Sequence, residues 1–169
     1  MERRSYEDSC RELLGHVPEM RTRKPDYEED EEEFGVNFFR TRIEDTDFSN
    51  MTLPRTFIAR TYVERASFRN TDLSESTLCW NDFADVDFTG ADLRGSDLRA
   101  SFFRAVNFSG ADLSDTDLRR SKYETCDFRG ARMTGARLTR PQAAALNLTG
   151  DQHDSIAWQP DDGEDPCGG

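Results

Sequence analysis

The stretch DFTGADLRGSDLRASFF, from Asp87 to Phe103, places a large apolar side chain at every fifth position, at Phe88, Leu93, Leu98 and Phe103. A step of five residues turns a side chain through about 140° on an α-helix, and an odd step moves it to the opposite face of a β-strand. Neither element can therefore bury this series on one side. The spacing predicts a chain that turns once in every five residues.

The same phase runs from Phe38 to Leu138 without a break. All 21 positions of the series are apolar or aromatic, although only 35% of the chain is hydrophobic. Two residues before each, 19 of 21 positions hold Ala, Thr, Ser, Val or Cys, with Met51 and Asn81 as the exceptions. Residues two apart on an extended segment share a face, so a large and a small side chain point inward together. Asp directly before the large residue, and Gly two after it, suit an outward turn.

A second period, of 20 residues, lies within the first. Taking every fourth large position gives an all-Phe series, and the next series is aliphatic. The two series are Phe48, Phe68, Phe88, Phe108, Phe128 and Leu53, Leu73, Leu93, Leu113, Met133. This pattern predicts a coil with four sides, in which like residues stack about 4.8 Å apart.

Units such as ADLRG (91–95), ADLSD (111–115) and CDFRG (126–130) resemble the A(D/N)LXX unit of the pentapeptide-repeat family, over residues 36–140. The resemblance implies an all-β fold, a right-handed quadrilateral β-solenoid of about five coils with short helical caps. It also implies a binding role. Some members of the family resemble duplex DNA in size and surface charge and bind DNA gyrase or related topoisomerases, and others protect against toxins and peptide antibiotics.

The repeat divides the chain into four parts. Residues 1–35 combine apolar residues at helical spacing with the acidic run YEEDEEE, which predicts an N-terminal amphipathic helix and an acidic linker. Residues 36–140 form the solenoid. Residues 141–150 begin with Pro and end with Gly, which predicts a helical cap. Residues 151–169 are acidic and rich in Pro and Gly, and we expect a disordered tail.

The net charge of −12 belongs to the two ends, because residues 1–34 and 149–169 each carry −6 and the repeat between them is neutral. Cys10, Cys79, Cys126 and Cys167 form no CxxC pair, so we expect neither zinc nor a disulfide. No run of 18 apolar residues predicts a membrane span, and MERRSYEDSC lacks the apolar region of a secretory signal. These features favour a cytoplasmic protein.

Catalytic motifs are missing from the sequence. The two histidines, His16 and His153, lie outside the repeat, and no phosphate loop, nucleophile elbow or metal-ligand spacing occurs. We interpret the recurring Asp residues as caps of their own turns rather than as catalytic carboxylates. The sequence therefore predicts a protein that is not an enzyme, with no cofactor, no metal and no small-molecule substrate.

One side of the predicted rod, that of Ile58, Leu78 and Leu98, carries seven arginines against two aspartates, whereas the other three sides are mildly acidic. Aromatic residues there and on the next side occupy outward positions. Exposed aromatic residues rimmed by Arg are typical of interaction hot spots. The predicted partner site comprises Phe57, Arg60, Tyr62, Trp80, Arg99, Phe102, Arg104 and Arg119. Alternatively, the N-terminal segment covers Phe57 and Tyr62.

Two functions remain open from the sequence. The protein binds and thereby blocks or protects a protein partner, such as a toxin, a topoisomerase or another nucleic-acid enzyme. Alternatively, it is a passive scaffold or spacer without a specific site. Direct nucleic-acid binding is a weaker option, because the acidic ends oppose contact with phosphates.

Overall fold

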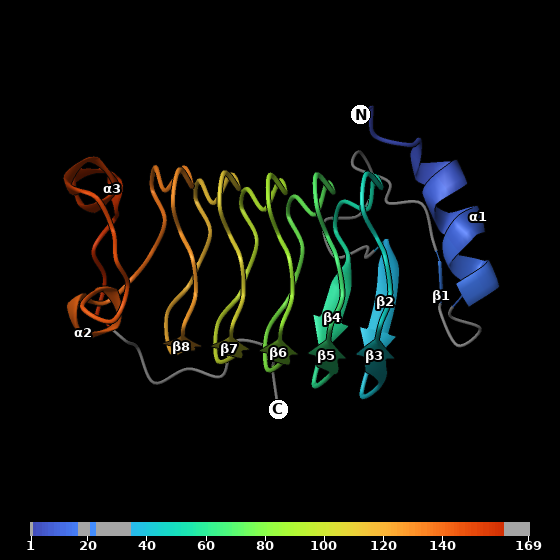
Figure 1. Ribbon diagram of the computed structural model, residues 1–169, viewed down its shortest axis with the longest axis horizontal. Coiled ribbons are helices and arrows are strands. Elements are labelled where there is room, and N and C mark those ends of the chain that lie inside the picture. Colours follow the sequence, from blue (N-terminus) through green and yellow to red (C-terminus); the bar gives the residue numbers. More distant parts are fainter. Residues whose placement is uncertain (1, 17–20, 23–34, 161–169) are drawn as a thin grey trace.

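The protein is a rod of stacked coils with helices at both ends (Figure 1). The computed structural model describes residues 2–16, 21–22 and 35–160, so the predicted linker and the end of the predicted tail lie outside the described residues. The elements are α1 (Tyr6–His16), β1 (Arg21–Thr22), β2 (Val36–Phe39), β3 (Arg42–Glu44), β4 (Phe57–Ala59), β5 (Tyr62–Glu64), β6 (Asp82–Ala84), β7 (Phe102–Arg104), β8 (Lys122–Glu124), α2 (Arg140–Ala143) and α3 (Gly150–Ser155). Within the described residues, every helix is too short or too polar to cross a bilayer.

Each coil uses 20 residues, because parallel pairing joins residues that are 20 apart. In β5, β6 and β7, Tyr62 lies opposite Asp82, and Asp82 lies opposite Phe102. This side forms a five-stranded parallel sheet in the order β3-β5-β6-β7-β8. On another side β2 pairs parallel with β4, and the remaining pairing is through isolated bridges, such as the one between Asp87 and Asn107. The predicted β-solenoid is thereby confirmed.

The corners of the coil lie two residues after each large inward residue. From Arg40 to Gly135, every fifth residue has a φ between 49° and 71°, and only five of these residues are glycine. Each non-glycine residue in this left-handed region costs about 1–2 kcal/mol. Backbone hydrogen bonds between coils offset that cost, as where the Trp80 N–H donates to the Arg99 carbonyl at 3.2 Å. Glycine at a corner position therefore predicts a turn, but a turn also forms where the corner residue is not glycine.

The core consists of the large residues of the five-residue series. All of them are buried except Tyr123, which is half-buried. The predicted Phe column is present, with ring centroids 4.5, 5.0, 5.3 and 4.9 Å apart from Phe48 through Phe128. A second column, of Phe83, Phe103 and Tyr123, meets the first edge to face. Two interlocked aromatic columns therefore fill this part of the rod.

At the N-terminal end, α1 covers the first coil. The backbone N–H of Thr52 donates to the Ser9 hydroxyl at 2.9 Å, and the Arg4 N–H donates to the Asn50 carbonyl at 2.7 Å. Leu13 is fully buried beneath the helix. Strand β1 pairs antiparallel with β2. These contacts satisfy an end of the solenoid that would otherwise expose its core and unpaired backbone groups.

At the C-terminal end, α2 and α3 each begin with a capping box, Thr139 with Gln142 and Thr149 with Gln152. The two Gln side chains also terminate the coils, because each amide nitrogen donates to two carbonyls of the rod. The bonds run from Gln142 to Leu118 (3.1 Å) and Ser121 (2.8 Å), and from Gln152 to Phe128 (2.8 Å) and Ala131 (2.9 Å). The amides thus replace the donors that a further coil would supply.

The expectation of disorder from residue 151 onward is wrong for residues 151–160. Ile156 is buried, and the N–H of Ala157 donates to the Ala136 carbonyl at 2.9 Å. Trp158 is half-buried and packs against the core. The acidic composition of this segment is confined to outward positions, so it does not prevent the apolar residues from packing against the last coil.

Candidate protein-binding surface

The outward Asp residues serve as turn caps, as the sequence analysis interpreted them. The carboxylate accepts the backbone N–H two residues ahead, as in Asp72 with Ser74 (3.0 Å) and Asp87 with Thr89 (2.9 Å). Asn107 does the same for Ser109 at 2.9 Å. These hydrogen bonds stabilise the charged form, and the pKa values of Asp87 and several equivalent carboxyls lie below their ordinary values although burial alone would raise them.

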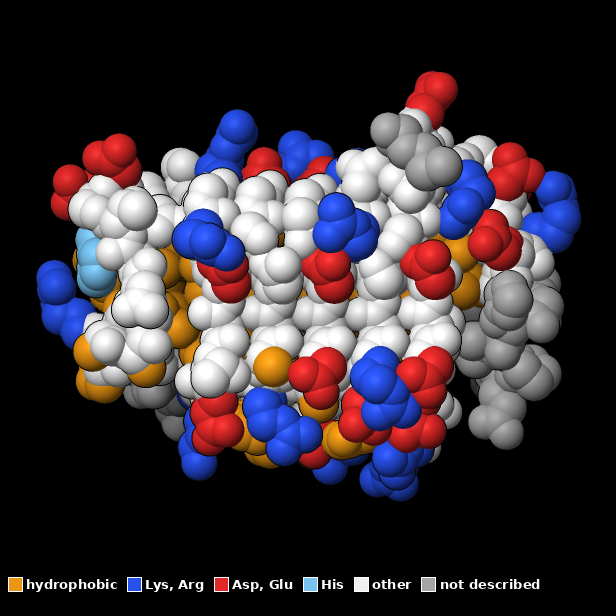
Figure 2. Space-filling view, viewed as in Figure 1, with side chains coloured by type: hydrophobic (Ala, Val, Ile, Leu, Met, Phe, Trp, Pro, Cys, Tyr) orange, Lys and Arg blue, Asp and Glu red, His pale blue; other side chains and the backbone are white. Residues whose placement is uncertain are grey.

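Arginine two residues after such an Asp binds the same carboxylate through its guanidinium group. This occurs in four D-x-R units, Asp92–Arg94, Asp97–Arg99, Asp117–Arg119 and Asp127–Arg129, with N–O distances of 2.6–3.0 Å. Figure 2 shows acidic side chains next to basic ones on a face that otherwise consists of small side chains and backbone. Most of the charge on these sides is therefore compensated in place.

This pairing changes the role of two predicted site residues. Arg99 and Arg119 are bound to Asp97 and Asp117, and Arg119 is buried, with 7% of its surface exposed. Its guanidinium also donates to the carbonyl of Pro160 at 3.2 Å. The structure therefore separates these two arginines from the exposed residues of the predicted site.

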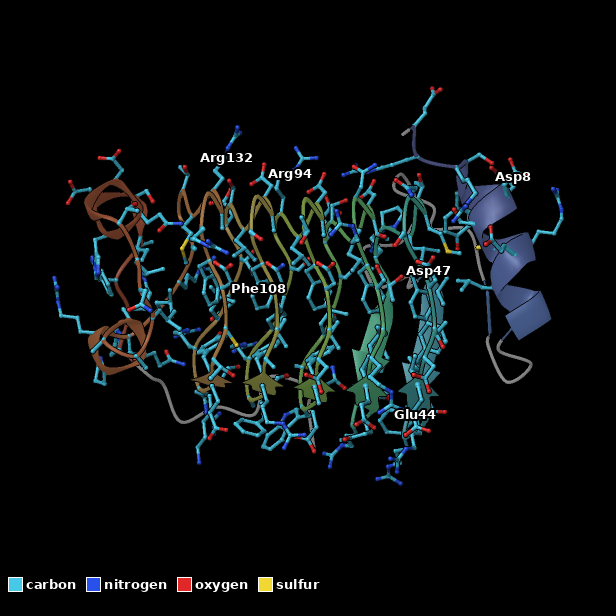
Figure 3. All side chains as sticks on the ribbon, viewed as in Figure 1. Asp8, Glu44, Asp47, Arg94, Phe108 and Arg132 are labelled. Carbon is cyan, nitrogen blue, oxygen red and sulfur yellow. The ribbon has the colours of Figure 1, made fainter. Side chains whose placement is uncertain are left out.

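The other predicted residues meet where the side of β4 turns into the side of β5. The register aligns Tyr62, Asp82 and Phe102 across β5, β6 and β7, and Trp80 lies on the turn two residues before Asp82. We define the cationic-aromatic corner as Arg40, Arg42, Arg60, Tyr62, Trp80, Asp82, Phe102, Arg104 and Lys122. It runs along the lower edge of Figure 1, where β3 and β5 to β8 are seen. In Figure 3, Glu44 of β3 marks this edge, whereas Arg94 and Arg132 lie at the upper edge and Phe108 inside the rod.

Cations and aromatic rings contact one another within the corner. Arg60 lies over the Trp80 ring at 5.9 Å, and Arg42 lies over Tyr62 at 4.6 Å. Trp80 is 37% exposed, which is unusual among the large apolar residues described, and Phe39 on the adjoining side is the other such case. Phe57 is half-buried beside Phe39, with the ring centroids 6.2 Å apart. The corner therefore presents aromatic surface together with positive charge.

Several corner cations differ from the arginines of the D-x-R units. Arg40, Arg60, Arg104 and Lys122 are exposed, and they form no ion pair with any residue of the described ranges. Arg40, Arg42 and Lys122 belong to this surface but were not among the residues of the predicted site. They could have been found by reading the outward positions at the 20-residue period, which puts Arg42 and Lys122 in the same column as Tyr62.

The alternative that the N-terminal segment covers Phe57 and Tyr62 stays a prediction. Helix α1 lies over the coil end, at Asn50 and Thr52. The rest of the segment, residues 23–34, lies outside the described residues.

The cysteines and the possible metal ligands of the described residues do not form a reactive site. Burial raises the pKa of the free thiols of Cys10 and Cys126. Cys79 is disulfide-bonded, so the expectation of a disulfide-free chain is wrong at this position. In the part of the chain that the structure describes, His, Cys, Asp and Glu form no cluster of three that could hold a metal ion.

Comparison with known proteins agrees with the observed repeat. The model of the family described as "Pentapeptide repeats" matches with eight copies, over residues 64–99, 90–122 and 103–140. Residues 64–140 therefore match the pentapeptide-repeat family, in agreement with the coils that these residues form. A search of curated proteins finds no match.

Among solved structures, the chain is similar to a pentapeptide repeat protein from the thylakoid lumen of Arabidopsis thaliana, at 26% identity and a TM-score of 0.45, over 68% of this chain and 72% of that one. It is similar to the protein Rfr23 from the cyanobacterium Cyanothece 51142, at 16% identity and a TM-score of 0.40, over 57% and 82% of the two chains. It is also similar to QnrB1, a plasmid-mediated fluoroquinolone resistance protein, at 14% identity and a TM-score of 0.31, over 73% and 89% of the chains.

Proposed function

We propose that this is a non-enzymatic binding protein that blocks or protects a protein partner, in an immunity-type or topoisomerase-modulating role. The observation that carries the proposal is the exposed Trp80, with Tyr62 and Phe102 in the adjoining column and Arg60 and Arg104 exposed beside them. Trp, Tyr and Arg are the residues most enriched in the hot spots of protein interfaces. The corner is therefore the surface through which we expect the partner to bind.

The exposed ring at Trp80 supports a binding role over a passive scaffold. The φ of 57° at this residue lies in the left-handed region, which glycine adopts without strain. Gly90, Gly95 and Gly110 occupy equivalent corner positions. A scaffold has no need of a large exposed ring at such a position. Fourteen other non-glycine corner residues of the described ranges share this φ, so the exposed aromatic ring, and not the backbone, favours a functional role.

The charge distribution supports contact through the corner rather than imitation of duplex DNA. A mimic of the phosphate backbone needs a regular negative surface. Here the outward Asp residues of the D-x-R units are paired with Arg, and the repeat carries no net charge. Direct nucleic-acid binding is disfavoured by the net charge of −12 on the whole chain.

Capture of partners from the native host tests this function. We expect the wild-type chain to retain a specific protein that the Trp80→Ala, Phe102→Ala double variant does not retain. The matched control is Arg69→Ala with Arg129→Ala, two exposed residues on the side of the Phe column, which should capture the same protein as wild type. Equal capture by the aromatic double variant, with folding verified by circular dichroism, would instead support the scaffold.

A further inference from the structure

The charges of the cationic-aromatic corner are ordered along the rod. Positive charge lies at both ends, at Arg40 in the first coil and at Lys122 in the last, whereas Arg42 is paired with Glu44 at 2.6 Å. The aromatic rings lie between them, and the one acid, Asp82, stands opposite both Tyr62 and Phe102 in the register. A ligand that covers the corner must therefore be negative at its ends and apolar toward its middle.

The exposed cations are the groups that such a ligand would bind. In the D-x-R units the arginine is held by the Asp of its own side, with N–O distances as short as 2.6 Å at Arg94 and Arg129. Arg60 and Arg104 have no acidic partner within the described ranges, although Asp82 lies in the strand between them. Their charge is available to groups from outside the chain.

We infer that the partner presents an acidic segment to this corner, with carboxylates that bind Arg60, Arg104 and Lys122 and an apolar side chain that packs on Trp80. This inference rests on the proposed function and specifies the chemistry of the partner. A carboxylate binds guanidinium through two parallel hydrogen bonds, which gives both strength and orientation. The aromatic rings supply the apolar contact area that anchors the segment.

A peptide fits the corner better than a nucleic acid. Asp82 lies at its centre, and Glu64 and Glu124 lie in the adjoining column. A uniform polyanion would place phosphates against these acids. A polypeptide can place a neutral or basic residue at Asp82 and acids at the flanking cations. The mixed charge of the corner therefore favours a protein segment.

Fluorescence anisotropy with a short labelled peptide of alternating Glu and Asp around a central Phe measures this binding. The Arg60→Gln, Arg104→Gln double variant should bind the peptide about tenfold more weakly than wild type at low ionic strength, and the difference should shrink at high salt. The matched control, Arg94→Gln with Arg129→Gln, removes the same charge from other sides and should change the dissociation constant by less than about twofold.

Replacing Asp82 by a cation is expected to increase the affinity for the peptide, which a misfolded variant would not do. Asp82→Lys should tighten peptide binding severalfold, since it removes the one repulsive charge of the corner. Asp154→Lys, an exposed acid in α3, changes the net charge equally and should have little effect. Weaker or unchanged binding by Asp82→Lys would overturn the inference.

Two further outcomes would also overturn it. In one, oligouridylate competes for the corner as well as the acidic peptide does. In the other, the labelled peptide fails to bind because the protein self-associates through the corner, as a size measurement would show. The proposed function can survive such a failure. If host-protein capture depends on Trp80 and Phe102 but not on Arg60 and Arg104, the acidic-segment inference falls alone. If capture depends on neither pair, both fall.

Discussion

The rings of Phe88 and Phe108 lie parallel, with centroids 5.3 Å apart and an angle of 3° between their planes. They are 20 residues apart in sequence, so the contact joins successive coils. Each ring also meets the neighbouring column edge to face, Phe88 through Phe83 and Phe108 through Phe103. A ring in this column therefore stabilises the coil on either side of it as well as its own.

Removing one ring from the middle of the column should be costly. We expect Phe88→Ala to lower the free energy of unfolding by about 3–5 kcal/mol, because it leaves a cavity between two coils. Denaturant unfolding followed by circular dichroism measures the change. Phe39→Ala removes the same group from a site that is 49% exposed and should cost much less. Equal effects of the two substitutions would contradict the assignment of the column to the core.

The glutamine caps are expected to matter as much as a core contact. Gln152 is buried, and its amide donates to the carbonyls of Phe128 and Ala131. Gln152→Ala should destabilise the C-terminal end by about 1–3 kcal/mol, because those carbonyls lose their donors. Gln159→Ala, at an exposed position, serves as the control in the same unfolding measurement. A cost at Gln152 no greater than at Gln159 would show that the amide is not a cap.

Stability should fall in acid. Burial raises the pKa of Asp117, but the hydrogen bonds from the guanidinium and backbone N–H of Arg119 outweigh it, so the pKa in the folded state lies below the ordinary value. Asp92 with Arg94 behaves likewise. A lowered folded-state pKa adds stability above the unfolded pKa, and that stability is lost as the pH falls through the folded pKa.

We therefore expect the free energy of unfolding to be nearly constant above about pH 5 and to decrease below about pH 4. Asp117→Asn should make that decrease shallower, since one of the groups that takes up a proton on unfolding is gone. Urea unfolding at a series of pH values measures the slope. A variant whose stability falls as steeply as that of wild type would contradict the role of this pair.

The fold could be predicted from the sequence because one rule governs every coil. The large residues from Phe38 to Leu138 and the 20-residue recurrence of Phe determine both the turn and the stacking, and no long-range information is needed. The cap at residues 151–160 does not belong to the repeat and could not be predicted from its period. Its signal was the spacing Thr-x-x-Gln at 139–142 and again at 149–152, which marks two helix starts, whereas composition alone indicated disorder.

The candidate surface could be predicted only in part. Arg99 and Arg119 were predicted to bind a partner because their side of the rod carries more arginines than aspartates. In a D-x-R unit, however, both charged residues point out from the same side, and the side chains pair. If the arginines of the D-x-R units are set aside as paired, the exposed cations of the corner remain as the group that could bind a partner. Contacts with the segments outside the described residues could not be derived from any repeat.

Trp80 should contribute more to binding than to folding. We expect Trp80→Gly to change the free energy of unfolding by less than about 1 kcal/mol, because the relief of the left-handed backbone offsets the lost ring contacts. Leu78→Ala, two residues earlier and fully buried, should cost about 2–5 kcal/mol. Thermal unfolding of the two variants separates the roles. A loss at Trp80 as large as that at Leu78 would make the ring structural.

Site-specific photocrosslinking tests the central claim, that a protein partner binds at the cationic-aromatic corner. A photoreactive residue is placed at Asp82, inside the corner, or at Arg129, an exposed site on the side of the Phe column, and irradiated with native-host extract. We expect one protein to crosslink from position 82 and not from position 129, and to disappear when Trp80 and Phe102 are both alanine. Crosslinking of that protein from position 129 alone, or equally from both positions, would contradict the account.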